Sequence, residues 1–219
     1  MPCLGRGDKM GVTIHYHGSL DDAAQLDAAL AMLREECERR GWPYRELDVE
    51  ARGPHETYTF RDVPGPLPGW IDTLTETEIV ELDTRWRGLS IDPHPKCESL
   101  LMMFDERDAR LMLLMSYGGE ANSVMYSLSV KTQFAPLEIH VAICEVLHRL
   151  QDEFGREKLS VDDESGYFQT RDMAALLEMR GVIEEGMKDI QTLNRIVQLG
   201  TIGDRVVPPD ASELSERRN

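Results

Sequence analysis

The sequence predicts an α+β fold: a central, mainly antiparallel sheet with an N-terminal βαβ unit, one helix packed on the sheet and a long C-terminal helix. Three observations favour it. A strand–helix–strand pattern opens the chain, short strand-like runs fill its middle, and two helical segments occupy its last third. A chain of 219 residues with 41% hydrophobic and 29% charged residues can bury such a core without disulfides or metal.

The start of the chain carries the βαβ pattern. Residues 12–16 have the apolar alternation of a short strand, and residues 23–40 repeat apolar side chains at helical spacing. Gly41 ends this helix because glycine readily adopts the left-handed conformation found after a helix. Residues 44–50 alternate apolar and charged side chains and predict the second strand. If both strands run parallel in one sheet, their connection is right-handed.

Prolines and glycines interrupt the pattern between residues 53 and 69. We interpret this segment as a surface loop, with a short edge strand at Tyr58 and Phe60, and as a candidate sub-boundary. The organisation that we predict is a flexible extension over residues 1–10, a single domain over 11–203 and a flexible tail over 204–219. The main alternative is two independent domains that meet near Gly69.

The middle of the chain is dominated by strand signals. Residues 80–86 alternate apolar and charged side chains, and residues 89–91 continue the strand after a glycine. Residues 99–104 and 110–116 predict a hairpin whose arms are almost wholly apolar, which is typical of a sheet buried on both faces. Residues 123–131 again alternate and predict one further strand.

The last third of the chain predicts two helices. Pro136 fits the start of the first, where its missing N–H costs no hydrogen bond, and this helix ends near Gly155. Short strands are expected at residues 159–163 and 167–169. Thr170 or Asp172 would cap the final helix, which continues to about Leu199.

The helix that begins after Pro136 carries the most distinctive chemistry. His140, Cys144 and His148 follow one another at intervals of four residues, so their side chains share one stripe of the helix. The stripe is flanked by apolar residues, which makes a purely solvated role improbable. The outer two side chains are about 12 Å apart along the axis, so one ion could bind two of the three with a ligand from elsewhere. The alternative is a helix packed on the sheet, with both histidines hydrogen-bonded at its margins.

Ligands from elsewhere are available. His15 and His17 lie two residues apart on the first strand and therefore share a face. The acidic run at residues 162–164 follows the helix closely. Histidine, cysteine and carboxylate side chains are ligands of zinc and iron. The predicted metal ligands are His15, His17, His140, Cys144 and His148, with zinc or iron as the ion.

Signals for a nucleophilic enzyme are weak. The sequence contains no GxSxG, no phosphate-binding loop of the GxxxxGK[ST] type and no GxGxxG. Cys97 follows His94 in a proline-rich loop, and Lys96 is available to lower the pKa of its thiol. A structural role for this loop remains the favoured interpretation.

The composition indicates which partners the protein could bind and in which cellular compartment it is expected. A net charge of −16 without a basic segment argues against nucleic acid. The four cysteines are scattered and predict reduced thiols. No apolar run approaches the roughly 20 residues that span a bilayer, and no signal peptide is apparent, so we expect a cytoplasmic protein without a membrane anchor.

These observations favour a cytosolic, acidic binding or regulatory protein of unknown ligand, because no complete catalytic constellation is present. The alternative is a metal-dependent hydrolase or related enzyme that uses a His/Cys/Asp cluster.

The final helix predicts a homodimer. A helix of about 27 residues is roughly 40 Å long and overhangs a small sheet, so its apolar seam needs a partner, most simply a second copy. The seam consists of Leu176, Met179, Ile183, Ile190, Leu193 and Val197, with Gly186 interrupting it. Sedimentation at micromolar concentration should give twice the chain mass, and Ile190→Glu should reduce it to one. A wild-type monomer, or a variant that unfolds without dissociating, would instead place the helix in the core of one subunit.

Overall fold

A computed structural model describes residues 12–62, 73–116, 122–182 and 185. The chain divides into two compact units, Met1–Leu177 and Glu178–Asn219, and the account below concerns the first. The predicted extension over residues 1–10, the tail over 204–219 and most of the final helix lie outside the described residues; within them, residues 173–182 are helical. Asp172 caps this helix, since its carboxylate accepts a hydrogen bond from the Ala174 amide at 2.8 Å.

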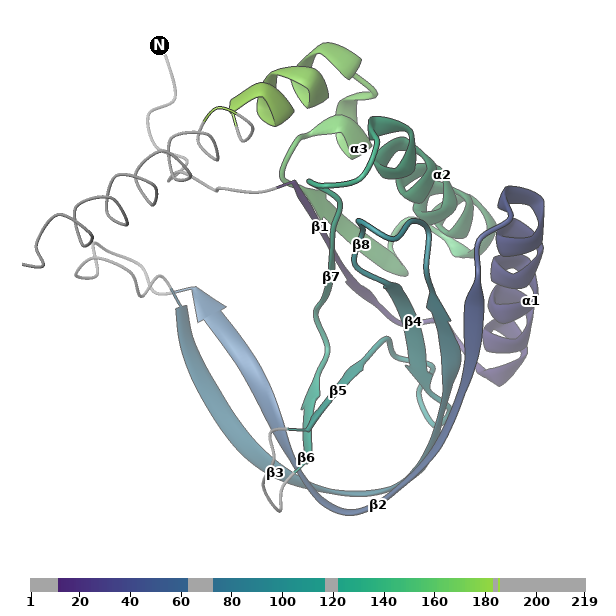
Figure 1. Ribbon diagram of the computed structural model, residues 1–219. Helices are drawn as coiled ribbons and strands as arrows, with labels where there is room; N and C mark the ends of the chain where they lie inside the picture. The colour runs from purple at the N-terminus through teal and green to yellow at the C-terminus, as the bar shows by residue number, and fades with distance from the viewer. Residues whose placement is uncertain (1–11, 63–72, 117–121, 183–184, 186–219) are drawn as a thin grey trace, which may run out of the picture. The chain divides into compact units, whose positions relative to one another are not determined.

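Strands and helices alternate irregularly along the first unit (Figure 1). In chain order the elements are β1 (Thr13–Gly18), α1 (Ala23–Arg40), β2 (Tyr44–Asp62), β3 (Thr73–Ile91), β4 (Leu100–Asp105), β5 (Leu113–Ser116), β6 (Asn122–Met125), β7 (Leu128–Lys131), α2 (Leu137–Phe154), β8 (Leu159–Asp163) and α3 (Tyr167–Thr170). The mixed α+β class is therefore confirmed.

The described strands form two ladders, one in the order β7-β1-β8 and the other in the order β4-β3-β2-β6-β5. All pairings in them are antiparallel except β2–β6, which is parallel. Residues 109–112 connect the ladders: the Leu111 amide donates to the Gly18 carbonyl at 2.9 Å, and the Met112 amide donates to the Met103 carbonyl at 2.9 Å. Strand pairing is mainly antiparallel, as predicted, but the strands form two sheets and not the single central sheet that the sequence predicted.

The predicted N-terminal βαβ unit is wrong in its pairing. Its strands and its helix form, and α1 covers the residues expected, but β1 and β2 belong to different ladders. The partners of β1 come from the last third of the chain: Ile14 lies opposite Val130 of β7 and Asp163 of β8. Alternation along a strand shows which face is apolar but not which strand lies beside it, so local sequence could not reveal this arrangement.

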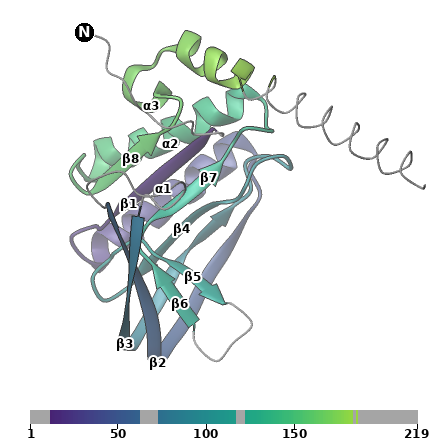
Figure 2. The same cartoon turned by 90° about the vertical axis from the view of Figure 1, so that its left-hand side faces the viewer.

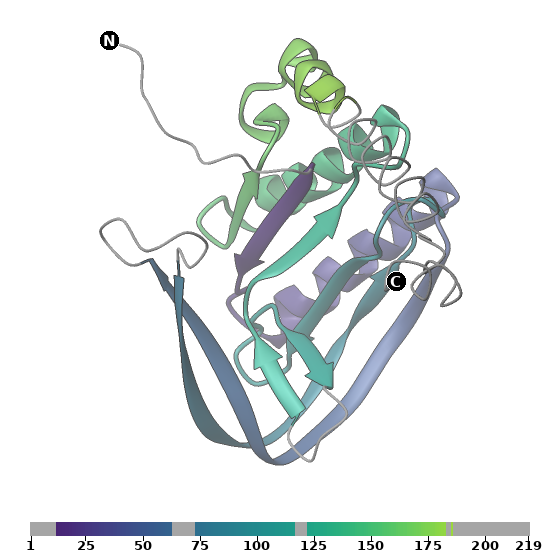
Figure 3. The same ribbon diagram turned by 60° about the vertical axis from the view of Figure 1, so that its left-hand side comes forward.

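The interpretation of residues 53–69 as a loop is wrong over its first part. β2 continues to Asp62 and pairs with β3 in unbroken register from Tyr44 opposite Ile91 onward. Gly53 adopts a φ of +90°, which lets the paired strands bend without losing register, and Pro54 is tolerated because β6 pairs with β2 only further along. Figures 1 and 3 show the resulting curved ribbon.

Three shorter predictions also need correction. The expected hairpin of residues 99–116 holds only beside its turn, because β5 leaves β4 and pairs with β6. The strand expected over residues 123–131 is two strands, β6 and β7, in different ladders (Figure 2). Residues 167–169 belong to the short helix α3 rather than to a strand. Its entry at Gly166, with a φ of +73°, turns the chain sharply after β8.

Both long helices cover one face of the sheets (Figures 1 and 3). Alternation in β1 sorts its side chains accordingly: Ile14 and Tyr16 are fully buried, whereas His15 is half-buried and His17 is exposed. The Tyr16 hydroxyl donates to the Leu101 carbonyl at 2.8 Å, so the polar atom that Tyr16 brings into this core is satisfied. The opposite face of the β1 ladder is therefore polar and lies away from the helices.

The other ladder carries a second apolar core on its far face. Its buried members are Ala51, Leu82, Trp86, Met103, Met112 and Val124. Figure 2 shows β5 and β6 beside the paired arms of β2 and β3, and Val124 of β6 belongs to the cluster. The almost wholly apolar arms recognised in the sequence around Met103 and Met112 are thus explained by burial on both faces.

An ionic cluster joins the two long helices. The side chain of Glu36 on α1 is 3% exposed and contacts Arg39, Arg40 and, from α2, Arg149. Burial alone would raise the pKa of Glu36, but the hydrogen bonds from these arginines outweigh it and lower the pKa to about 2. The cluster therefore remains ionised over the whole physiological range.

The outer edge of β8 is partly protected. The side-chain amide of Gln151 donates to the Leu159 carbonyl at 2.8 Å, and that of Gln169 donates to the Val161 carbonyl at 3.1 Å. Unpaired backbone groups at a sheet edge promote pairing with other chains, and these two amides occupy the acceptors.

Replacement of Gly88 by alanine tests the close approach of β3 and β4. A Cβ atom at Gly88 would lie 2.2 Å from the Met102 carbonyl oxygen, so the strands would have to separate. We expect Gly88→Ala to lower the free energy of unfolding in urea by about 3 kcal/mol. As a control, a Cβ at Gly181 meets nothing within 4 Å, and Gly181→Ala should raise stability by up to about 1 kcal/mol, because alanine favours helix. Unchanged stability in Gly88→Ala would contradict the packing described.

Candidate functional site

A buried polar cluster lies between α2 and the end of β8. His140 is 1% exposed and Asp163 2%, and the His140 Nε2 atom lies 3.1 Å from Asp163 Oδ2. The Thr132 hydroxyl lies 2.8 Å from His140 Nδ1, and the Ser165 hydroxyl lies 2.8 Å from Asp163 Oδ2. Tyr167 packs its ring edge-on to the imidazole, with 6.0 Å between centroids.

The local sequence explains why a carboxylate can be buried here. Asp163 ends β8 where the chain turns into α3, and its carboxylate accepts hydrogen bonds from the backbone amides of Ser165 and Phe168, each at 2.9 Å. Burial alone would raise the pKa of Asp163, but the hydrogen bond and charge of His140, together with these donors, lower it. Asp163 is therefore an ionised group whose acceptor capacity is used within the protein.

Both ring nitrogens of His140 have partners whichever protonation state is present. Nε2–H donates to Asp163, and Nδ1 can accept from the Thr132 hydroxyl or, when protonated, donate to it. Thr132 can in turn donate to the Val12 carbonyl at 3.2 Å. A Ser165–His140–Asp163 catalytic triad is not formed, because serine and aspartate approach the same nitrogen of the ring.

Cys144 completes the only group of three potential metal ligands found within the described residues. Its Sγ and the ligand atoms of His140 and Asp163 all lie within 4.8 Å of one another. Burial, followed by the charge of Asp163, raises the pKa of the Cys144 thiol well above its ordinary value. A thiol that keeps its proton is a poor metal ligand, so an ion would have to displace that proton and the existing hydrogen bonds.

The structure brings together only part of the predicted ligand set. His140 and Cys144 are adjacent, and Asp163 joins them from the acidic run. His15 faces away from the helices, with Nε2 at 3.4 Å from Glu164 Oε1. His17 is exposed on that same face of β1.

His148 has a separate packing role. Its Nε2 lies 2.9 Å from the Phe168 carbonyl, and its ring stacks on that of Phe168 at 3.8 Å. Burial lowers the pKa of His148, which favours the neutral ring in this stack.

The loop that carries Cys97 does not hold a nucleophile–base pair. Burial, with a contribution from Glu98, raises the pKa of Cys97 to about 12, and its Sγ lies 3.5 Å from the Lys131 carbonyl. His94 instead accepts a hydrogen bond from the Lys96 amide at 3.0 Å. These contacts hold the loop, and the raised pKa keeps the Cys97 thiol protonated at neutral pH.

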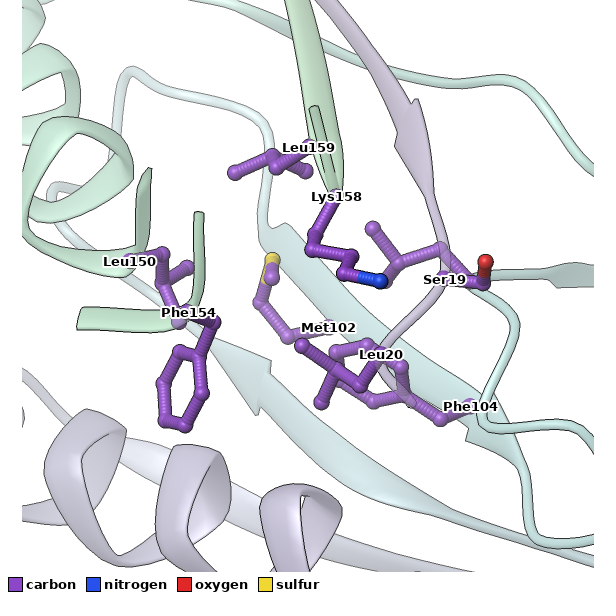
Figure 4. Close-up of a pocket in the computed structure, with 9 residues that line it drawn as sticks. Ser19, Leu20, Met102, Phe104, Leu150, Phe154, Lys158 and Leu159 are labelled. Atoms are coloured by element: carbon purple, nitrogen blue, oxygen red, sulfur yellow. The ribbon is translucent and has the colours of Figure 1, made fainter. Parts of the chain in front are cut away.

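Two of the hollows in the described structure are poor candidates for a ligand. An apolar pocket of about 10 Å³ between α2 and β4 has room for little more than one water molecule (Figure 4). In Figure 4, Leu150 and Phe154 of α2 lie across it from Met102 and Phe104. A second hollow of about 360 Å³ lies beside α1 and is lined by Arg34, Arg85 and Arg87, each of which is paired with a carboxylate.

A third hollow, of about 390 Å³, opens on the polar side of the sheet at the end of β1. It is lined by His17, Gly18, Ser19, Asp108, Arg110, Tyr126, Glu157, Lys158 and Ser160. We call it the β1 cleft. Among the predicted site residues it contains His17 alone, and no sequence motif marked the others, because they come from four separate segments.

Within the part of the chain that is described, no helix combines the length and apolar character needed to cross a bilayer. Comparisons with protein-family models, with curated proteins and with solved structures find no match to this chain.

Replacement of Asp163 by asparagine tests the buried cluster. Asp163→Asn leaves His140 and two backbone amides without their anionic acceptor, and we expect it to lower the free energy of unfolding by about 3–5 kcal/mol at neutral pH. Because the pKa of Asp163 is lowered from 3.8 in the folded state, its contribution is complete above that value and is lost as the pH falls through the folded-state pKa. The difference between wild type and variant should therefore be constant down to about pH 5 and shrink below about pH 4.

Urea unfolding at a series of pH values measures this difference. Asp152→Asn is the matched control, since Asp152 is 68% exposed and lies 3.8 Å from exposed Arg156; it should behave like wild type. A difference that grows on acidification would mean that Asp163 is not the stabilising anion.

Proposed function

We propose that the protein is an acidic, cytosolic binding or regulatory protein rather than an enzyme. One observation carries the proposal: the buried acid–base groups His140 and Asp163 are 1–2% exposed and hydrogen-bonded to one another and to their own fold. A general acid or base must reach a substrate proton, and this pair is closed to one. The β1 cleft lies elsewhere, on the polar side of the sheet, and its size suits binding of a small molecule.

A metal-dependent hydrolase is the second candidate, and the donor set of His140, Cys144 and Asp163 favours it. Zinc or iron would fit the combination of nitrogen, sulfur and oxygen ligands. A hydrolytic metal needs an open coordination position for water and substrate, whereas all three of these residues are buried. An ion held here would therefore be structural, which ranks this candidate below binding.

We also propose that the protein is a homodimer through its C-terminal helix. Leu176, the first residue of the predicted seam, is 0% exposed, so its side chain is already covered within one chain. Leu177, beside it, is 53% exposed, so an apolar side chain of the helix is available to a partner there. A dimer contact would begin after Leu176 and use the later seam residues.

Metal analysis separates the binding protein from the metalloenzyme. Protein purified without a histidine tag should contain no stoichiometric zinc or iron, and chelation should leave its melting temperature unchanged. Stoichiometric metal together with hydrolytic activity, both lost in His140→Ala and Cys144→Ala, would overturn the ranking, whereas metal without such activity would mark a structural ion.

Two variants serve as controls for that measurement. His148→Ala removes a histidine of the same helix stripe, and Cys37→Ala removes a buried cysteine of α1. Metal that survives in both controls but not in the cluster variants would assign the ion to His140 and Cys144.

A further inference from the structure

The β1 cleft combines side chains that the fold holds on one polar face. His17 and Ser160 lie directly opposite each other in the β1–β8 ladder, so their side chains project to the same side. That side is the one not covered by α1 and α2. Gly18 also lines the cleft, and a Cβ atom there would lie 1.9 Å from the Lys158 carbonyl oxygen, so β1 and β8 approach closely at this point.

Arg110 forms the positively charged wall. Its guanidinium lies over the ring of Tyr126 at 3.8 Å, an arrangement that holds the planar group in place and leaves its N–H edges free. Burial raises the pKa of Tyr126, so the ring beneath stays neutral. Across the described residues, Arg110 forms no ion pair. A guanidinium whose plane is held in place can bind a carboxylate through two parallel hydrogen bonds.

The opposite charge is provided by Glu157 and Asp108. Glu157 forms no ion pair within the described ranges, whereas Asp108 accepts a hydrogen bond from the Arg110 amide at 3.2 Å and lies 3.9 Å from the Arg107 guanidinium. The other cation of the cleft, Lys158, is already paired with Asp21. Among the described residues, the unpaired charges left for a ligand are therefore the guanidinium of Arg110 and the carboxylate of Glu157, with the carboxylate of Asp108 shared with Arg107.

Because the cleft holds a guanidinium and carboxylates together, it does not suit a ligand that carries only one kind of charge. Phosphate would meet Asp108 and Glu157 as well as Arg110, and a simple cation would meet the guanidinium. A ligand with a carboxylate at one end and an ammonium group at the other satisfies both. The volume of about 390 Å³ falls at the lower end of the range usual for small-molecule sites, which suits a ligand of dipeptide size.

We propose that the β1 cleft binds a free dipeptide or a zwitterion of similar size, with its carboxylate on Arg110 and its ammonium group near Glu157 and Asp108. His17 and Ser160 are placed to hydrogen-bond the group between the two charges. This inference rests on the proposed function, because it requires the ligand to be bound without being consumed.

Two-dimensional amide NMR of the full chain, titrated with a pool of free dipeptides, tests the assignment. We expect shifts at Gly18, Ser19, Arg110 and Ser160. The same pool acetylated at the N-terminus, or amidated at the C-terminus, should need roughly tenfold higher concentration, because each lacks one charge-assisted contact. Equal responses to free and blocked pools would overturn the proposal, as would a stronger response to inorganic phosphate at the same residues.

Variants on the rim of the cleft assign the two charges. Arg110→Gln and Glu157→Gln should each weaken binding of the free pool roughly tenfold. Arg156→Gln is the matched control, because Arg156 is 79% exposed, lies next to Glu157 and does not line the cleft. Unaltered binding in Arg110→Gln, with a well-dispersed spectrum that shows an intact fold, would remove the cleft as the site.

The same samples distinguish failure of this inference from failure of the proposed function. Release of free amino acids over time by the wild-type protein would overturn the binding-only function and leave the site in place. An absence of shifts in folded protein would overturn the site and leave the proposed function standing.

Discussion

Asp163 ends β8 directly opposite Ile14, and its buried carboxylate accepts hydrogen bonds from His140 of α2 and from the turn at Ser165 that leads into α3. An ionised group so far from water persists only while these donors stay in place. The requirement fixes three elements relative to β1 at once: β8 by register, α2 through its imidazole and α3 through its first turn. Apolar packing around this point is less specific, because aliphatic side chains tolerate small shifts that a hydrogen-bonded carboxylate does not.

The same constraint determines where chemistry can occur. His140 and Asp163 lie on the helix side of the sheet, where they are buried and hydrogen-bonded to each other. These two acid–base groups therefore stabilise the fold. The face behind them is left to the alternate residues of β1 and β8, which are polar because they meet water. Binding at His17 and Ser160 is then a consequence of strand alternation, since each residue next to a core position must point to the cleft side.

The features that could be predicted from the sequence are those that depend on residues close together in the chain, such as helix ends. Helix ends were correct at Gly41 and near Gly155 because glycine and proline act on their own neighbours. The βαβ pairing failed because β1 pairs with strands more than a hundred residues away, and no local pattern encodes a partner. At the site, four-residue spacing correctly placed His140 and Cys144 on one face. It could not show that Asp163 and Thr132 would satisfy the histidine from two other segments.

The β1 cleft could not be predicted from the sequence for a further reason. A net charge of −16 argues against a site for anions if charge is taken as a property of the whole chain. At physiological ionic strength the field of a surface charge decays over about 8 Å, so a bound carboxylate responds to the groups nearest to it. Arg110 on the ring of Tyr126 is such a group, and the acidic surface beyond it is largely screened. The negative charge of the whole chain therefore slows the association of an anion more than it weakens the binding of that anion. A ligand that also carries an ammonium group has no net negative charge, so its association is not slowed in this way.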